Sequence, residues 1–251
     1  MDVNIKRDGL TLHGVLEGTD QLENQEVAIL LHGFKGNMGY TPDHLNYQVA
    51  KRLNAKGIPT LRLDFIGCGK SEGDFADMDV FNEIEDAIQT LQFAKKVIKA
   101  EKVYVIGHSQ GGVVASMLGG YYHDLIDKLV LLAPAATLKS DAINGKCQGV
   151  EYDSEHIPDQ VVVDGWTVGG KYFRIAQLLP IYETAARYDG PVLLVHGLAD
   201  KVVDYFASVK YDKIYQNSEL HLIKGAGHRL FGDGGQRAET LQLISDFICK
   251  K

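Results

Sequence analysis

Residues 103–118 read VYVIGHSQGGVVASML, and this stretch decides the fold. Residues 103–106 form an apolar run of strand length, and residues 111–122 carry apolar side chains at the three- and four-residue spacing of a helix. Between them lies Gly-His-Ser-Gln-Gly at 107–111, which puts Ser109 in a sharp turn from a strand into a helix. Glycines flank the serine because larger side chains would strike the neighbouring strand or helix. The pattern therefore predicts a nucleophile at a strand end.

Similar apolar runs recur along the chain, separated by segments with helical spacing. Strands are expected at residues 27–31, 60–63, 103–106, 129–132, 192–195 and 220–223, and helices at 44–54, 80–98, 111–122, 205–215 and 236–249. Runs that are apolar on both faces imply a sheet covered on both sides, so the sequence predicts a doubly wound, mostly parallel α/β sheet. Residues 4–7 and 11–16, joined near Asp8-Gly9, predict an antiparallel hairpin on its edge.

The bulk properties indicate one domain over residues 1–251, because 45% hydrophobic and 24% charged residues are ordinary values for a globular chain of this length. A net charge of −7 without a basic cluster argues against nucleic acid or an anionic membrane as partner. No signal peptide or membrane span is recognised. Three cysteines without a CxxC predict neither a disulfide framework nor a zinc site, so we expect a cytoplasmic protein, with a homodimer left open.

One stretch breaks the alternation of strands and helices. Residues 134–180, after the sixth predicted strand, contain no clean strand and no long amphipathic helix, yet they hold Tyr152, Trp166, Tyr172 and Phe173. That aromatic content is unlike a low-complexity linker. A connection of this length inside a compact domain is usually a lid or a binding loop, so we expect an inserted cap.

A serine hydroxyl is a poor nucleophile until a base takes its proton, so a histidine must come from elsewhere in the chain. His228 ends the glycine loop Gly-Ala-Gly-His just past the last predicted strand. Asp200 follows the preceding strand and is expected to orient that histidine, which gives a known triad order of serine, aspartate, histidine. Asp204 also follows that strand, but its place near the next helix favours an N-cap role.

Attack by Ser109 builds negative charge on a carbonyl oxygen, and two backbone N–H groups must face it. Gln110, directly after the nucleophile, is expected to supply one. The second is expected from the loop His-Gly-Phe-Lys-Gly at 32–36, where Phe34 is the natural donor, although this loop taken alone could equally be an ordinary glycine turn. This chemistry uses no cofactor.

Metal binding is the alternative interpretation of the histidines. His32, His108 and His196 are all expected near strand ends, where they could meet. No HxH or HExxH spacing puts two of them on one element, so the sequence predicts no metal site.

Several motifs together resemble the α/β-hydrolase superfamily over essentially the whole chain. They are HGF at 32–34, DFIGCGKS at 64–71, GHSQG at 107–111, Asp200, and Gly-His at 227–228. A narrower resemblance is to the bacterial cinnamoyl (feruloyl) esterases, through GHSQGGVVAS at 107–116, LLAPAA at 131–136, and QGV at 148–150, HIPD at 156–159 and GGKY at 169–172 in the cap.

The resemblance implies an esterase acting on esters of ferulate, caffeate or p-coumarate, with the cap covering the aromatic acyl group. It implies substrate contacts from Asp141, Gln148 and Tyr172, and His108 is grouped with them. Each cap residue could instead only hold the cap together. The rival functions are a monoglyceride-type lipid or short-chain aliphatic esterase, and a non-catalytic binding module on the same fold.

Overall fold

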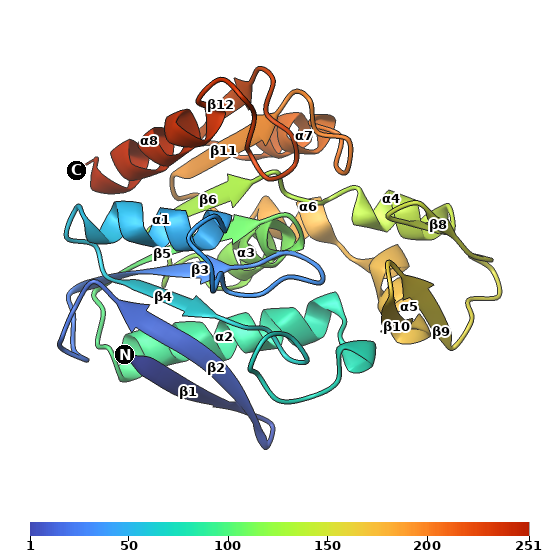
Figure 1. Ribbon diagram of the computed structural model, residues 1–251, viewed down its shortest axis with the longest axis horizontal. Helices are drawn as coiled ribbons and strands as arrows, with labels where there is room; N and C mark the ends of the chain where they lie inside the picture. The colour runs from blue at the N-terminus through green and yellow to red at the C-terminus, as the bar shows by residue number, and fades with distance from the viewer. Residues whose placement is uncertain (251) are drawn as a thin grey trace.

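The strand before Ser109 lies near the middle of an eight-stranded sheet in the computed structural model, which describes residues 1–250 (Figure 1). The strands follow the order β1-β2-β4-β3-β5-β6-β11-β12. Their bounds are β1 Asp2–Arg7, β2 Leu10–Glu17, β3 Glu26–Leu31, β4 Thr60–Leu63, β5 Lys102–His108, β6 Lys128–Leu132, β11 Val192–Gly197 and β12 Ser218–Ile223. Strand β2 pairs antiparallel with β1 and β4, and all pairs from β4 to β12 are parallel. The predicted mostly parallel α/β sheet is confirmed.

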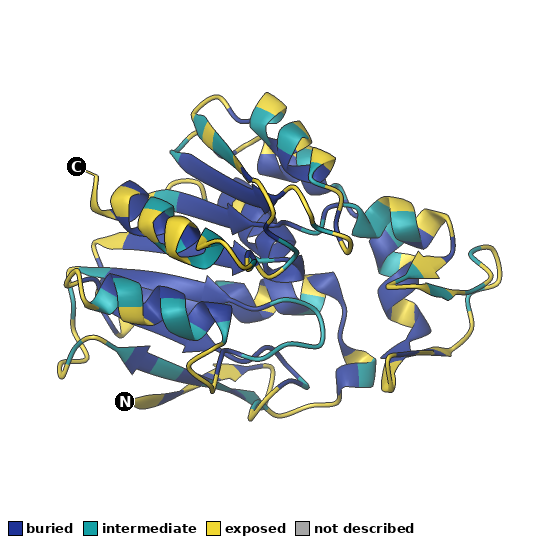
Figure 2. Cartoon of the chain, turned by 45° about the horizontal axis from the view of Figure 1, so that its top comes forward, coloured by how far each residue is buried: buried dark blue, intermediate teal, exposed yellow. Residues whose placement is uncertain are grey.

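Helices cover both faces because successive side chains of a buried strand point in opposite directions. In β3, Val27, Ile29 and Leu31 enter one core, whereas Ala28 and Leu30 enter the other. The first core packs against α2 (Val80–Lys96), α3 (Gln110–Tyr121), α6 (Ile181–Ala185) and α7 (Phe206–Ile214), and the second against α1 (Leu45–Asn54) and α8 (Gln236–Cys249). Figure 2 shows the buried strands between helices whose outer sides are exposed. None of the helices within residues 1–250 combines the length and apolar character needed to cross a membrane.

The segment 134–180 is more regular than its sequence suggested. It contains α4 (Leu138–Ile143), α5 (Gly170–Leu178) and two antiparallel hairpins, β7–β8 (Lys146–Cys147 with Val150–Glu151) and β9–β10 (Gln160–Val163 with Trp166–Gly169). The expectation of no strand here is therefore wrong. Both hairpins turn on two residues of positive φ, Gln148-Gly149 and Asp164-Gly165, as tight two-residue turns require. Figure 1 places this segment to one side of the sheet.

Candidate active site

Ser109 sits in a strained turn between β5 and α3. Its φ of 57° and ψ of −122° lie in a region that side-chain-bearing residues rarely adopt. A Cβ on Gly107 would lie 2.1 Å from the Gly111 carbonyl oxygen, and one on Gly111 would lie 2.3 Å from the His32 carbonyl oxygen. Only glycine fits at both positions, so the two flanking glycines allow the turn that projects Ser109 from the end of the strand.

Three loops bring a serine, a histidine and an aspartate into line. His228, in the loop after β12, has its Nε2 2.9 Å from the Ser109 Oγ and its Nδ1 2.7 Å from the Asp200 Oδ2. Asp200 follows β11, and its Oδ1 accepts hydrogen bonds from the backbone N–H groups of Val202 and Val203 at 2.8 and 3.0 Å. The structure thus joins the three residues expected from the sequence, with the spacing of a nucleophile, a base and an orienting acid.

The carboxyl of Asp200 is held in its ionised form. Burial alone would raise its pKa, but hydrogen bonds from His196 and His228 outweigh burial and hold the pKa well below its ordinary value. The rival Asp204 instead accepts a hydrogen bond from the Phe206 N–H at the start of α7, at 2.9 Å. Asp204 therefore serves the helix end and not the histidine.

The loop after β3 approaches the serine closely. A Cβ on Gly33 would lie 2.8 Å from the Ser109 Cβ, which brings Phe34 next to the nucleophile. The buried His32 ring fixes this loop, because its Nε2 accepts the Phe65 N–H at 3.0 Å and its Nδ1 therefore donates to the Gly33 carbonyl at 2.8 Å. Gln110 follows Ser109 directly as the first residue of α3. The two residues expected to supply the oxyanion donors thus lie close to Ser109.

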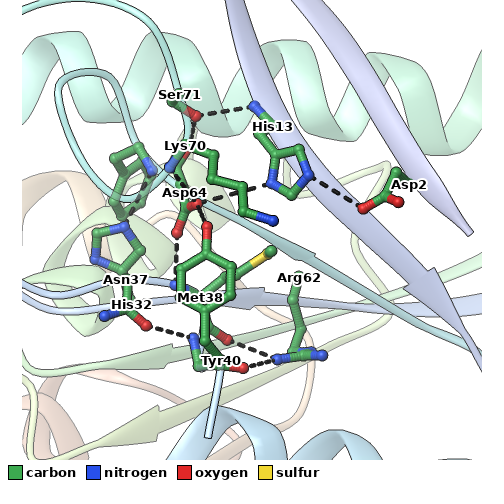
Figure 3. Close-up of polar contacts among 12 residues, drawn as sticks. Asp2, His13, His32, Asn37, Met38, Tyr40, Arg62, Asp64, Lys70 and Ser71 are labelled. Atoms are coloured by element: carbon green, nitrogen blue, oxygen red, sulfur yellow. Dashed lines mark hydrogen bonds and ion pairs between the residues drawn. The ribbon is translucent and has the colours of Figure 1, made fainter.

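A buried carboxylate anchors the far end of the same loop (Figure 3). Asp64, at the end of β4, accepts hydrogen bonds from the backbone N–H groups of Met38 at 2.7 Å and Lys70 at 2.9 Å, and from the Tyr40 hydroxyl. Arg62 donates to the Met38 carbonyl at 3.1 Å and pairs with Glu17. Sequence reasoning gave Asp64 no role, although it opens one of the motifs that carried the resemblance.

Comparison with known proteins agrees with this geometry. Residues 23–151, just over half of the chain, match the family described as serine aminopeptidase, S33. The chain belongs to this family. It is a serine hydrolase with the α/β-hydrolase fold.

Among solved structures, this hydrolase is similar to Est1E from Butyrivibrio proteoclasticus with ferulic acid bound, at 32% identity and a TM-score of 0.90 over 98% of this chain and 97% of that one. It is 23% identical to the monoacylglycerol lipase of Mycolicibacterium smegmatis over 87% of this chain and 86% of the lipase. It is 28% identical to the lysophosphatidylserine lipase ABHD12 of Danio rerio over 81% of its own length, but it spans only half of that lipase.

The hydrolase has a pocket between Ser109 and residues 134–180, the segment predicted to be a cap and called the cap below. This pocket is partly open to solvent. The residues that line it on the side of the sheet are Phe34, Ser109, Gln110, Val202 and Val203, and those from residues 134–180 are Ala135, Thr137, Leu138, Asp141, Ala142, Lys146, Cys147, Gln148, Tyr172 and Phe173. Three of the four predicted substrate contacts, Asp141, Gln148 and Tyr172, therefore reach this pocket. Burial raises the pKa of the Asp141 carboxyl.

Tyr172 connects the cap to the nucleophile turn. Its hydroxyl donates to the Gln110 Oε1 at 2.7 Å, and its ring stacks on Phe34 with 5.3 Å between centroids. The Gln110 amide donates in turn to the buried Glu83 carboxyl of α2 at 2.8 Å, and burial raises the pKa of Glu83 well above its ordinary value. Sequence reasoning missed this contact of Glu83, because Glu83 lies on a different helix from Gln110 and belongs to no motif.

His108 is the exception among the predicted substrate contacts. It is absent from the pocket lining, and its Nε2 instead lies 2.9 Å from the His228 carbonyl oxygen, to which it donates. Burial and the neighbouring His228 lower its pKa to about 3, so the ring is neutral. In the structure His108 thus supports the loop that carries His228, and its predicted contact with the substrate stays a prediction.

The cap is tied to the rest of the chain at its hairpin and at α5. Lys35 pairs with Asp164 in the β9–β10 turn at 2.5 Å, and Lys171 pairs with the buried Asp79 at 2.7 Å. Trp166 packs edge-on against Phe75, which lies in the short 3₁₀ helix η1 (Phe75–Asp77), with 4.7 Å between ring centroids. These contacts hold the cap in place over the pocket.

Proposed function

We propose that this hydrolase is a carboxylesterase that cleaves esters of hydroxycinnamic acids through an acyl-enzyme on Ser109. The observation that carries this chemistry is the hydrogen-bonded triad, in which His228 lies 2.9 Å from the Ser109 Oγ and 2.7 Å from the Asp200 Oδ2. His228 takes the serine proton as Ser109 attacks the ester carbonyl, and the N–H groups of Phe34 and Gln110 face the developing oxyanion. His228 then protonates the leaving alcohol and activates the water that releases the acid.

The pocket supports an acyl group that is flat and carries a hydroxyl. Phe34 and Tyr172 are stacked on one another beside Ser109, which gives the pocket an aromatic wall. Asp141 offers carboxyl oxygens that can accept a hydrogen bond from a ring hydroxyl. Because the Tyr172 proton is already donated to Gln110, this hydroxyl can only accept from a ligand. The similarity to Est1E with ferulic acid bound supports the same acyl class.

A lipid ester is the second candidate substrate. The match to a monoacylglycerol lipase over most of both chains favours it, and so do apolar pocket residues such as Leu138 and Phe173. The third candidate function is a non-catalytic binding module. That function would not require the hydrogen bond between His228 and Ser109. Covalent labelling of Ser109 by a fluorophosphonate probe separates the enzyme from the binding module.

Asp141→Ala tests the substrate class. A site built around a hydroxyl leaves its own polar group unpaired when the substrate lacks one. We therefore expect the wild type to prefer methyl p-coumarate to methyl cinnamate in kcat/KM. Asp141→Ala should erase much of that preference, about 1–3 kcal/mol, while barely changing hydrolysis of p-nitrophenyl acetate.

The matched control is Asp159→Ala, which removes an exposed carboxylate of the cap that does not line the pocket. It should leave both the preference and the acetate rate unchanged. If Asp141→Ala lowers the activity toward methyl p-coumarate, methyl cinnamate and p-nitrophenyl acetate equally, Asp141 has a structural role only. A wild type that prefers long-chain p-nitrophenyl esters to both cinnamates would favour the lipid esterase instead.

A further inference from the structure

A second histidine reaches the aspartate of the triad. His196 lies near the end of β11, is fully buried, and is absent from the pocket lining. Its Nε2 is 3.1 Å from the Asp200 Oδ2 and 3.1 Å from the Val203 carbonyl oxygen. Its Nδ1 is 2.8 Å from the Oγ of Ser208, a buried residue of α7. The imidazole thus spans the space between Asp200 and α7.

The partners of His196 define where its proton lies. A carboxylate and a backbone carbonyl can only accept hydrogen bonds, so the His196 Nε2 must carry a hydrogen. The Ser208 hydroxyl contacts Nδ1 on the other side of the ring, and the Nε2–H points at Asp200. The N–H groups of His196 and His228 therefore converge on one oxygen, Oδ2 of Asp200.

We propose that His196 is a positioning residue that holds Asp200 and moderates its pull on His228, an inference that rests on the proposed role of the triad. The backbone N–H groups of Val202 and Val203 hold Oδ1, so with His196 in place the carboxylate cannot rotate away from His228. The N–H of His196 also draws on the negative charge of Oδ2, which leaves less of that charge to stabilise the His228 imidazolium.

Loss of His196 has a predictable effect on the base. With one donor fewer, more of the charge on Oδ2 acts on His228, and the acid limb of the pH profile of kcat/KM should move to higher pH. Asp200, Ser109 and His108 contact the ring of His228, and the ring of His108 is neutral over the range of interest because its pKa lies near 3. The acid limb of the pH profile therefore reports on the pair of Asp200 and His228.

The test compares His196→Leu with His196→Gln by the pH profile of kcat/KM for p-nitrophenyl acetate. Leucine removes the donor, so we expect kcat/KM to fall about tenfold or more and the acid limb to move up by about half a pH unit or more. The amide nitrogen of glutamine can replace Nε2 as donor to Asp200, so His196→Gln should return the limb toward the wild-type position. His221→Leu, on the neighbouring strand β12 opposite Val195, is the matched control and should leave the limb in place.

Ser208→Ala keeps the test decisive if His196→Leu does not fold. It frees the Nδ1 side of the ring, so we expect a smaller shift of the acid limb in the same direction. The positioning role is overturned if the acid limb of kcat/KM stays in place in a folded His196→Leu variant. If that variant does not fold, an unmoved acid limb in Ser208→Ala overturns it. Asp200→Asn measured alongside separates the two proposals: wild-type activity in that variant would instead refute the triad itself.

Discussion

At the scale of single residues, the site depends on which of two nearby carboxylates turns toward the histidine. Asp200 and Asp204 follow the same strand, and the sequence assigned the first to the triad and the second to a helix end. The structure places them accordingly, with Asp200 at 2.7 Å from His228 and Asp204 at 2.9 Å from the Phe206 N–H. The two residues therefore offer a matched pair of substitutions.

Asp200→Asn should be far more damaging than Asp204→Asn. An amide in place of the Asp200 carboxylate neither selects the tautomer of His228 nor stabilises its imidazolium, so kcat should fall by about 10³–10⁴. The asparagine side-chain oxygen can accept the same hydrogen bond from the Phe206 N–H, so Asp204→Asn should stay close to the wild type in both activity and stability. Steady-state kinetics with p-nitrophenyl acetate measure the difference. Comparable mild losses in the two variants would contradict the assignment of Asp200.

For single residues, the sequence does not predict the direction in which a side chain points. Ser109, Asp200 and His228 could be predicted because each follows a strand, and the carboxyl ends of parallel strands meet at one edge of the sheet. The partners of Tyr172 and His108 could not, because a hydroxyl or an imidazole on a helix or turn can point several ways. Tyr172 meets Gln110, and His108 meets a backbone carbonyl, through packing that no motif encodes.

At the scale of elements, α1 shows how burial and helix capping combine. Its N-cap is His44, whose Nδ1 accepts the Asn46 N–H at 3.2 Å. Only an unprotonated nitrogen can accept that hydrogen bond. Burial, followed by the positive charges of nearby arginines, lowers the pKa of His44 to about 4, so the ring stays neutral and the cap is kept.

His44→Asn should make the helix end less sensitive to acid. A histidine whose pKa is lower in the folded than in the unfolded state contributes stability above the unfolded value of about 6.5, and this is lost as the pH falls toward 4. Asparagine caps the helix without titrating. The difference in the free energy of unfolding between His44→Asn and wild type should therefore shift in favour of the variant by about 1–2 kcal/mol when the pH is lowered from 7 to 5. Urea denaturation at the two pH values measures this, with the exposed His123→Asn as control. A constant difference at both pH values would refute the titration of His44.

The cap elements mark where sequence patterns were informative but overlooked. Asp164-Gly165 is a favourable two-residue hairpin turn, and three β-branched valines, which favour strands, precede it at 161–163. Hairpin β9–β10 was therefore predictable. Hairpin β7–β8 has only two residues in each strand, too few to show a period of two, so its position depends on contacts within the folded cap.

At the scale of the whole molecule, the cap and the sheet share one core. Val163, Val168 and Phe173 of the cap belong to the same buried cluster as Val105 of β5 and Val113 of α3. These apolar residues of the cap are therefore buried together with those of the sheet and its helices. Removing the cap would expose apolar side chains on the cap and on the sheet. Cooperative unfolding of cap and sheet is the consequence.

Trp166 makes this cooperativity measurable, because it is the only tryptophan of the chain and lies in cap strand β10. Its fluorescence reports the cap, whereas far-UV circular dichroism reports the helices and strands of the whole molecule. We expect the two signals to change at the same urea concentration. Phe75→Leu, which removes the ring packed on Trp166, should lower both midpoints together. A fluorescence transition at clearly lower urea would show that the cap unfolds independently.

The backbone angles of Ser109 also have an evolutionary meaning. Glycine would adopt φ 57° and ψ −122° without the cost of about 1–3 kcal/mol that a residue with a side chain incurs there. Selection for folding alone would thus favour glycine at position 109, and drift would erase the hydroxyl within a protein that still folds. A serine at this position, in register with His228 and Asp200, indicates a lineage in which catalytic turnover was under selection at the expense of stability.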